Sequence, residues 1–88
     1  MKEFAYIVKI KNGIHARPAG KITTAAKGFK SEIKIYNEEK EADAKRLLSV
    51  MSLGAKYEAR LTFKINGNDE REAEIGLKNV LKSLESEE

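Results

Sequence analysis

The chain of 88 residues contains no cysteine, which excludes disulfide bridges and thiolate metal sites. It contains one histidine, His15, so a histidine-rich metal site is excluded as well. No apolar run is long enough to cross a bilayer, and the opening MKEFAYIVKI alternates in polarity where a signal peptide has a continuous apolar core. We therefore expect a protein of the reducing cytoplasm, without a cleaved leader, membrane insertion, a bound metal or a cofactor.

The remaining composition is typical of a folded chain with a heavily charged surface. Hydrophobic residues make up 41% of the sequence and charged residues 35%, and a chain of this length buries one modest core. We expect a single domain over residues 1–88. The net charge is +3, but three of the 14 acids lie in the last four residues, ESEE, so residues 1–84 carry +6. This charge favours acidic partners without choosing among proteins, phosphates and nucleic acid.

Four segments alternate polar and apolar residues at the period of two that is typical of strands with one buried face. They cover residues 4–10, residues 31–37, a short edge strand near residue 41, and residues 60–66. The side chains predicted to face the core are Phe4, Tyr6, Val8, Ile10, Ile33, Ile35, Leu61, Phe63 and Ile65.

The first predicted helix spans Ala16–Lys27, with an apolar stripe at helical spacing. Pro18 falls in its first turn, where the missing N–H costs nothing. Lys27 suits the negative end of the helix dipole, and we expect Gly28 to end the helix in the left-handed conformation.

Two further helices are predicted, over Arg46–Gly54 and after a capping box formed by Asp69 and Glu72. We expect the acidic end of the chain to fray. The apolar stripe of the last helix is Ala73, Leu77, Val80, Leu81 and Leu84. The order β-α-β-β-α-β-α predicts an α+β fold, an open-faced two-layer sandwich in which three helices cover one face of a four-stranded antiparallel sheet.

The only histidine lies in the stretch NGIHARPAG, residues 12–20, at the start of the first predicted helix. The amides of a first helical turn, here those of Ala16 and Arg17, favour bound phosphate, and a guanidinium offers a fork of donors to its oxygens. An uncharged imidazole is a nucleophile. His15 is therefore a candidate phosphoryl acceptor, on a turn that Pro18 stiffens. The alternative is that His15 only caps a helix and that Arg17 is a solvated surface charge.

The run GIHARPA, residues 13–19, resembles the active-site signature of HPr, the histidine-containing phosphocarrier family of the bacterial phosphoenolpyruvate-dependent sugar phosphotransferase system. The segment AKGFKSEI, residues 26–33, is similar to the family's first helix end and second strand, and VMSLGA, residues 50–55, to its central short helix. The predicted element order agrees with the family over the whole chain.

The resemblance implies a carrier that is a reusable substrate and not an enzyme. Enzyme I, phosphorylated by phosphoenolpyruvate, would transfer its phosphoryl group to a ring nitrogen of His15, the pros nitrogen, and the carrier would deliver it to sugar-specific IIA domains. Arg17 matches the family arginine that interacts with the phosphoryl group. Asn12 and Gly13 match the preceding turn.

A carrier has to bind several proteins through one surface, and this chain offers an apolar centre with a basic rim, expected to act as a monomer. Leu47, Leu48 and Met51 match docking residues of the family; the alternative for Leu47 and Met51 is core packing. The expected partner surface is Gly20, Lys21, Thr24, Lys27, Arg46, Leu47, Leu48 and Met51.

Arg46 departs from the family pattern. Many Gram-positive members carry at this position a serine that an ATP-dependent kinase phosphorylates, which damps carrier activity and creates a corepressor of catabolite genes. Because arginine cannot accept that phosphate, we expect the chain to lack this switch. Arg46 either strengthens the basic rim or is a solvated surface charge.

Three other functions are compatible with parts of the pattern. A carrier of a regulatory phosphotransferase branch would look much the same, although the intact HARPA favours the sugar type. A small RNA-binding module shares the α+β outline and the positive charge, but such a module would need exposed aromatic side chains on the sheet for base stacking. An independent enzyme is disfavoured because there is no glycine-rich phosphate loop and no paired acid–base constellation.

Overall fold

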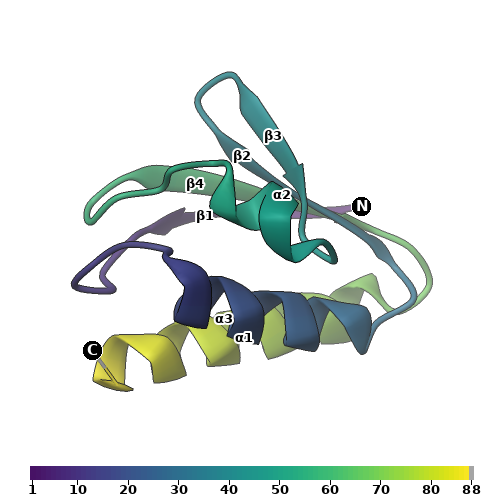
Figure 1. The fold of residues 1–88 in the computed structure, drawn as a ribbon. Coiled ribbons are helices and arrows are strands. Elements are labelled where there is room, and N and C mark those ends of the chain that lie inside the picture. The colour runs from purple at the N-terminus through teal and green to yellow at the C-terminus, as the bar shows by residue number, and fades with distance from the viewer. Residues whose placement is uncertain (88) are drawn as a thin grey trace.

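The structure is a computed structural model that describes residues 1–87. The predicted fold class is confirmed: an α+β fold with a four-stranded sheet and three helices (Figure 1). In chain order the elements are β1 (Lys2–Ile7), α1 (Ala16–Lys27), β2 (Glu32–Asn37), β3 (Lys40–Asp43), α2 (Leu47–Met51), β4 (Arg60–Asn66) and α3 (Glu70–Glu87).

The sheet has the strand order β1-β4-β2-β3, and every neighbouring pair is antiparallel. The strand made last, β4, lies between β1 and β2, and Phe63 at its centre pairs with Phe4 on one side and Ile35 on the other. The Phe4 and Phe63 rings stack with their centroids 4.8 Å apart. This register places the apolar positions of all three strands on the same face of the sheet.

The helices form a second layer on that face. In Figure 1, α1 and α3 lie side by side beneath the sheet and run in opposite directions, and α2 lies against the β2–β3 end. The carboxyl end of α3, drawn in yellow, therefore lies at the same end of the molecule as the start of α1, drawn in dark blue. None of the helices within residues 1–87 combines the length and the apolar character needed to cross a membrane.

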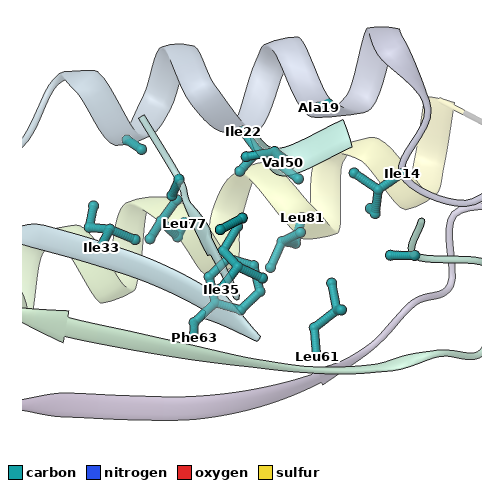
Figure 2. Packing of buried hydrophobic residues seen from close by; sticks show 14 of the residues in the cluster. Ile14, Ala19, Ile22, Ile33, Ile35, Val50, Leu61, Phe63, Leu77 and Leu81 are labelled. Atoms are coloured by element: carbon teal, nitrogen blue, oxygen red, sulfur yellow. The ribbon is translucent and has the colours of Figure 1, made fainter. Parts of the chain in front are cut away.

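The core lies between the two layers and contains the predicted apolar positions (Figure 2). Fully burying a leucine, isoleucine or phenylalanine side chain contributes about 1.5–3 kcal/mol, so this cluster dominates the stability of the fold. Side chains from the helices point toward those of the sheet: Ala19 and Ile22 of α1, Val50 of α2, and Leu77 and Leu81 of α3 face Ile33, Ile35, Leu61 and Phe63.

Helix α1 has the predicted bounds, but the prediction for Gly28 is wrong. Gly28 has φ −74°, a right-handed conformation, and its amide donates to the Ala25 carbonyl at 3.1 Å. The amide of Phe29 donates to the Ala26 carbonyl at 3.2 Å. The helix therefore ends by tightening into a 3₁₀-type turn, which satisfies its last carbonyls without a left-handed residue.

The start of α3 also differs from the expectation. The Asp69 carboxylate accepts hydrogen bonds from the Lys30 amide at 2.7 Å and the Ser31 amide at 2.9 Å, on the connection between α1 and β2. The carboxylate that reaches back at this helix start belongs to Glu70, which accepts from the Gly67 amide at 3.2 Å. The contact predicted for Glu72 is thus made by Glu70, to a glycine that has no side chain to complete a capping box, and Asp69 serves as a tertiary contact.

Candidate functional site

The loop before α1 is held by its backbone. Gly13 has φ +76°, and a Cβ atom at this position would lie 2.5 Å from the Ala55 carbonyl oxygen. The next amide, that of Ile14, donates to the same carbonyl at 2.9 Å, and the Ile14 side chain is 5% exposed. Only glycine combines this left-handed conformation with so close an approach. The turn predicted from Asn12 and Gly13 therefore anchors the residue that precedes His15.

His15 is the residue before α1, and its side chain is exposed. Its backbone is extended, with φ −85° and ψ −167°, and its carbonyl accepts the first helical hydrogen bond, from the Ala19 amide at 2.9 Å. The imidazole makes no side-chain capping bond to the helix. The imidazole of His15 therefore lies at the amino end of α1, as predicted, but the alternative in which the ring caps the helix is not what the structure contains.

The surroundings of the ring suit an anion. First-turn amides of an α-helix point along the axis toward its amino end. In α1 these are the amides of Ala16 and Arg17, because Pro18 has no N–H and is buried. The positive end of the helix dipole lies at the same place, and α1 has no acidic residue in its first turn.

Arg17 forms an ion pair across the two long helices. Its guanidinium donates to Oε1 of Glu87 in the last turn of α3, and Nζ of Lys21 lies 3.8 Å from the same oxygen. The hydrogen bond from Arg17 and the nearby charge of Lys21 hold the pKa of the Glu87 carboxyl below its ordinary value. Arg17 and Lys21 therefore hold a carboxylate beside the start of α1.

An open groove of about 580 Å³ runs between α1 and α3 beside this ion pair. Gly20 forms part of the α1 wall, and Val80 and Leu84 form the apolar α3 wall. Arg17, Lys21 and Glu87 lie along the same groove. It joins part of the predicted partner surface to the residues around His15.

The α2 part of the predicted partner surface is exposed. Leu48 is 78% exposed, Leu47 is 41% exposed and Met51 is 37% exposed. Val50 and Leu53 of the same segment are buried, as their places in the apolar pattern indicate. The alternative of core packing is therefore wrong for Leu47 and Met51.

Basic residues surround the exposed apolar side chains. Arg46 is the residue before α2 and is exposed, and with Lys27 and Lys45 it lines a hollow of about 540 Å³ next to Leu47 and Leu48. Thr24 and Lys27 continue the exposed stripe of α1. The fold thus brings the predicted partner residues of α1 and α2 onto adjoining surface.

Sequence reasoning missed two residues of the site, Ile14 and Glu87. The aliphatic residue between Gly13 and His15 is the anchor that fixes the loop. Glu87 was placed in a frayed end, but α3 continues to it. Its spacing from Val80 and Leu84 follows the helical period, which is the signal that could have placed it on the face toward α1.

Metal binding and the stacking of nucleic-acid bases find little support in the part of the chain that the structure describes. Residues 1–87 hold no cluster of three or more histidine, cysteine, aspartate or glutamate side chains suited to a metal ion. On the open face of the sheet Tyr36 is half-buried, with Nζ of Lys64 4.9 Å from its ring centroid, while Tyr6 packs on the core side. The sheet therefore lacks the row of exposed aromatics expected for base stacking.

Comparisons with known proteins agree on one family. The family model of the PTS HPr component phosphorylation site matches residues 2–83. The phosphocarrier protein HPr of Mycoplasma pneumoniae is 43% identical over 82 residues, which cover 92% of this chain and 93% of that protein. The protein of the same description from Mycoplasma genitalium is 39% identical over 82 residues, with the same coverage of 92% and 93%.

A solved structure gives the same answer. HPr-C-His from Thermoanaerobacter tengcongensis is 35% identical and superposes with a TM-score of 0.93, covering 100% of this chain and 99% of that one. The fold and these relatives define a phosphocarrier protein, a substrate that carries a phosphoryl group and not a catalyst. The chain belongs to the HPr family of the phosphotransferase system.

Proposed function

We propose that His15 accepts the phosphoryl group from phosphorylated Enzyme I and passes it to sugar-specific IIA domains during carbohydrate uptake. The observation that carries the proposal is the place of the only histidine: exposed, next to Ala16 and Arg17 at the amino end of α1. An acceptor has to be reachable by a large donor, and its adduct has to be stabilised. The exposed ring meets the first need and the helix start meets the second.

In the proposed transfer, the lone pair of the pros nitrogen of His15 attacks phosphorus. The bond between phosphorus and the donor breaks, and its electron pair leaves with the donor. Delivery to the IIA domain reverses these roles, with the His15 ring as the leaving group. No oxidant, metal ligand or cofactor on the carrier is needed, because positioning and charge stabilisation suffice for a group that moves intact.

The neighbouring residues have distinct parts in this proposal. The amides of Ala16 and Arg17 and the Arg17 guanidinium stabilise the phosphoryl oxygens. Gly13 and Pro18 hold the backbone on either side of the ring, and Asn12 completes the turn.

Partner binding is proposed for the exposed residues of α1 and α2. Leu47, Leu48 and Met51 form the apolar centre and Lys21, Lys27 and Arg46 the basic rim, with Gly20 and Thr24 between them. Enzyme I and the IIA domains are the proposed partners, and the carrier is proposed to work as a single-domain monomer in the cytoplasm. One shared surface is consistent with transient, electrostatically steered association.

The experiment that tests the carrier function uses Enzyme I, magnesium and phosphoenolpyruvate. The wild-type protein should gain one acid-labile, base-stable phosphate, and His15→Ala should gain none. Because His15 is exposed and makes no capping bond, this variant should remain folded, which circular dichroism checks. A wild-type protein that stays unmodified with a competent Enzyme I would disprove the proposal.

The role of Arg17 is tested by the rate of the same reaction. Arg17→Ala should slow transfer roughly ten- to a hundred-fold, the range of one charge-assisted hydrogen bond. Arg71→Ala, which removes an exposed arginine at the other end of the helical layer, is the control. Equal rates for the two variants would remove Arg17 from the mechanism.

Arg46 is proposed to leave the chain without the serine switch of Gram-positive relatives. Incubation with the ATP-dependent kinase should leave this protein unmodified, while a relative that carries the serine gains phosphate. Incorporation into this chain would contradict the proposal.

A further inference from the structure

A second group of exposed side chains lies at the end of the molecule that holds the loop before α1. Ile7 ends β1 and is 42% exposed, and Tyr57, on the connection from α2 to β4, is 54% exposed. Residues 7–11 and 56–60 carry four exposed basic side chains and one exposed acidic one, that of Glu58. We call this group the loop-end patch: Ile7, Lys9, Lys11, Lys56, Tyr57 and Arg60.

Backbone hydrogen bonds join the two connections that carry the patch. The Val8 amide donates to the Ala59 carbonyl at 2.9 Å, and the Glu58 amide donates to the Val8 carbonyl at 2.7 Å. Farther along, the Ile14 amide donates to the Ala55 carbonyl. In Figure 1 the connection between β1 and α1 and the connection between α2 and β4 accordingly lie at the same end of the molecule. The patch therefore adjoins the loop that positions His15.

The turn that carries Tyr57 is strained and held in place. Glu58 has φ +74°, a left-handed conformation that costs free energy in any residue other than glycine. The Ala59 amide donates to the Lys56 carbonyl at 2.9 Å, and Val8 pairs with both Glu58 and Ala59. Backbone strain of this kind persists only where the surroundings fix the conformation. Tyr57 is therefore presented on a preorganised turn, so little backbone freedom is lost when a partner covers it.

Tyr57 lies within reach of a large protein bound at His15. A Cβ atom on Gly13 would lie 3.1 Å from the Lys56 Cα atom. Because consecutive Cα atoms are about 3.8 Å apart, the Cα atoms of His15 and Tyr57 are no more than about 16 Å apart. A protein interface of ordinary size covers about 800 Å² of each partner, which is a disc of about 16 Å radius. A donor that encloses His15 therefore also reaches the patch.

The chemistry of the patch fits an acidic protein surface. Apolar side chains inside a basic rim match acidic groups around an apolar contact, and opposite charges steer association. Tyrosine is among the residues that most often dominate the binding energy of an interface. Single-stranded nucleic acid, in contrast, stacks successive bases on several aromatic rings, and the patch has one.

We propose that the loop-end patch is a second docking surface for the phosphoryl donor, Enzyme I, with Tyr57 as its anchor and acidic side chains of the donor on its basic residues. The inference rests on the proposed function of His15. It places donor contacts on both sides of the histidine loop, because the exposed side chains of α2 lie in the surface already assigned to partners.

The direct test measures how fast Enzyme I, with magnesium and phosphoenolpyruvate, phosphorylates increasing concentrations of the carrier. Tyr57→Ser should raise the KM for the carrier more than about five-fold and leave kcat and the final phosphate content unchanged, since only binding is lost. Ile75→Ser, which removes a side chain that is 56% exposed on α3, is the matched control and should follow the wild type. Tyr57→Phe keeps the ring and should lie near the wild type.

The basic rim is tested by its salt dependence. A double variant, Lys11→Gln with Lys56→Gln, should raise the KM about two- to five-fold at low salt, and the difference from the wild type should shrink at high salt. The control removes two exposed charges of α3, Arg71→Gln with Lys82→Gln, and should leave the KM unchanged.

Other roles of the patch predict different results. A purely structural role for Tyr57 would lower the thermal midpoint of Tyr57→Ser and leave its KM equal to that of Ile75→Ser, and this result overturns the inference. Equal KM values for the two double variants at low salt also overturn it. Binding of a single-stranded RNA of about ten nucleotides that depends on Tyr57, with an unchanged KM for Enzyme I, would assign the patch to nucleic acid.

The same variants separate this inference from the proposed function. Phosphorylation of the wild type, Tyr57→Ser and Ile75→Ser with equal KM values would remove the patch and keep the carrier. If Enzyme I phosphorylates none of the three, calorimetric titration with Enzyme I decides. Binding that weakens only in Tyr57→Ser would then remove the carrier and keep the docking surface, and absence of binding would remove both.

Discussion

Ser31 donates two hydrogen bonds to Asp69, one from its amide at 2.9 Å and one from its hydroxyl, across 38 residues of sequence. The Lys30 amide donates a third, at 2.7 Å. One carboxylate thereby joins the connection after α1 to the start of α3 and satisfies two backbone donors. The two long helices are thus linked at this end by Asp69 and at the other end by the Arg17–Glu87 pair.

The contacts of Asp69 predict how stability depends on pH. Hydrogen bonds from the Ser31 hydroxyl and the Lys30 amide hold the pKa of the Asp69 carboxyl below its ordinary value. Its stabilising contribution is therefore present above the ordinary carboxyl pKa and is lost as the pH falls through the lowered value of the folded state. Asp69→Asn should unfold at lower urea concentration than the wild type at neutral pH, and the two midpoints should converge in acid.

Glu72→Gln, which removes an exposed charge from the same helical turn, is the control for that experiment. A constant gap between wild type and Asp69→Asn from neutral to acidic pH would show that the carboxylate charge is not what stabilises this contact.

Two glycines near His15 should respond to alanine in opposite directions. Gly13→Ala requires a left-handed alanine with its Cβ 2.5 Å from a carbonyl oxygen, and it should cost more than about 1–2 kcal/mol. Gly20 lies inside α1 with nothing within 4 Å of an added Cβ, so Gly20→Ala should stabilise by about 0.5–1 kcal/mol. Urea unfolding of the two variants measures both. A neutral Gly13→Ala would show that the loop adjusts without strain.

Thr23 offers a stabilising substitution in the core. Its hydroxyl oxygen is buried and makes no hydrogen bond within the described residues. Replacing it with a methyl group of similar size removes an unsatisfied polar atom, so Thr23→Val should raise the free energy of unfolding by about 1 kcal/mol. Thr24→Val, at the exposed neighbouring position, should change it little. A destabilised Thr23→Val would indicate that the hydroxyl has a partner in solution, such as a buried water.

The exposed Leu48 of α2 and the buried Leu53, which follows α2, should separate binding from stability. Leu48 is 78% exposed, so Leu48→Ala should change the free energy of unfolding by less than about 0.5 kcal/mol. It should nevertheless weaken binding to Enzyme I by more than about five-fold, if the exposed leucine lies at the centre of the interface. Leu53 is 2% exposed, and Leu53→Ala should cost about 2–5 kcal/mol. Calorimetric binding and urea unfolding distinguish the two; unchanged Enzyme I affinity for Leu48→Ala would exclude α2 from the interface.

The bounds of α1 could be predicted from the sequence because several independent signals coincide there. Pro18, Lys27 and the apolar stripe all indicate the same bounds, and the structure has those bounds. The predicted first strand, residues 4–10, lies later in the chain than the observed β1, Lys2–Ile7. The reason is that pairing with the distant strand β4 sets where β1 begins and ends. Ile7 pairs with Arg60, where β4 begins, so the ladder stops there although Val8 and Ile10 remain buried.

Tertiary contacts explain what local patterns could not predict. Gly28 and Gly54 both follow helices, yet only Gly54 is left-handed, with φ +59°. The backbone conformation of each glycine depends on the direction that the chain takes after the helix, and amino-acid composition does not determine that direction. Asp69 has the spacing of a helix cap but bonds to Ser31, and Glu87 meets Arg17 only because α1 and α3 run in opposite directions.

The central place of β4 has a consequence for how the protein is made. Strand β4, residues 60–66, is the neighbour of β1 and the second neighbour of β2. Strand β1 is synthesised first and therefore has no partner strand until β4 has been synthesised. A chain released from the ribosome before residue 60 would carry β1 without a neighbour and β2 paired only with β3, with open edges prone to aggregation. Truncated copies should therefore be degraded or aggregate instead of competing with intact carriers for their partners.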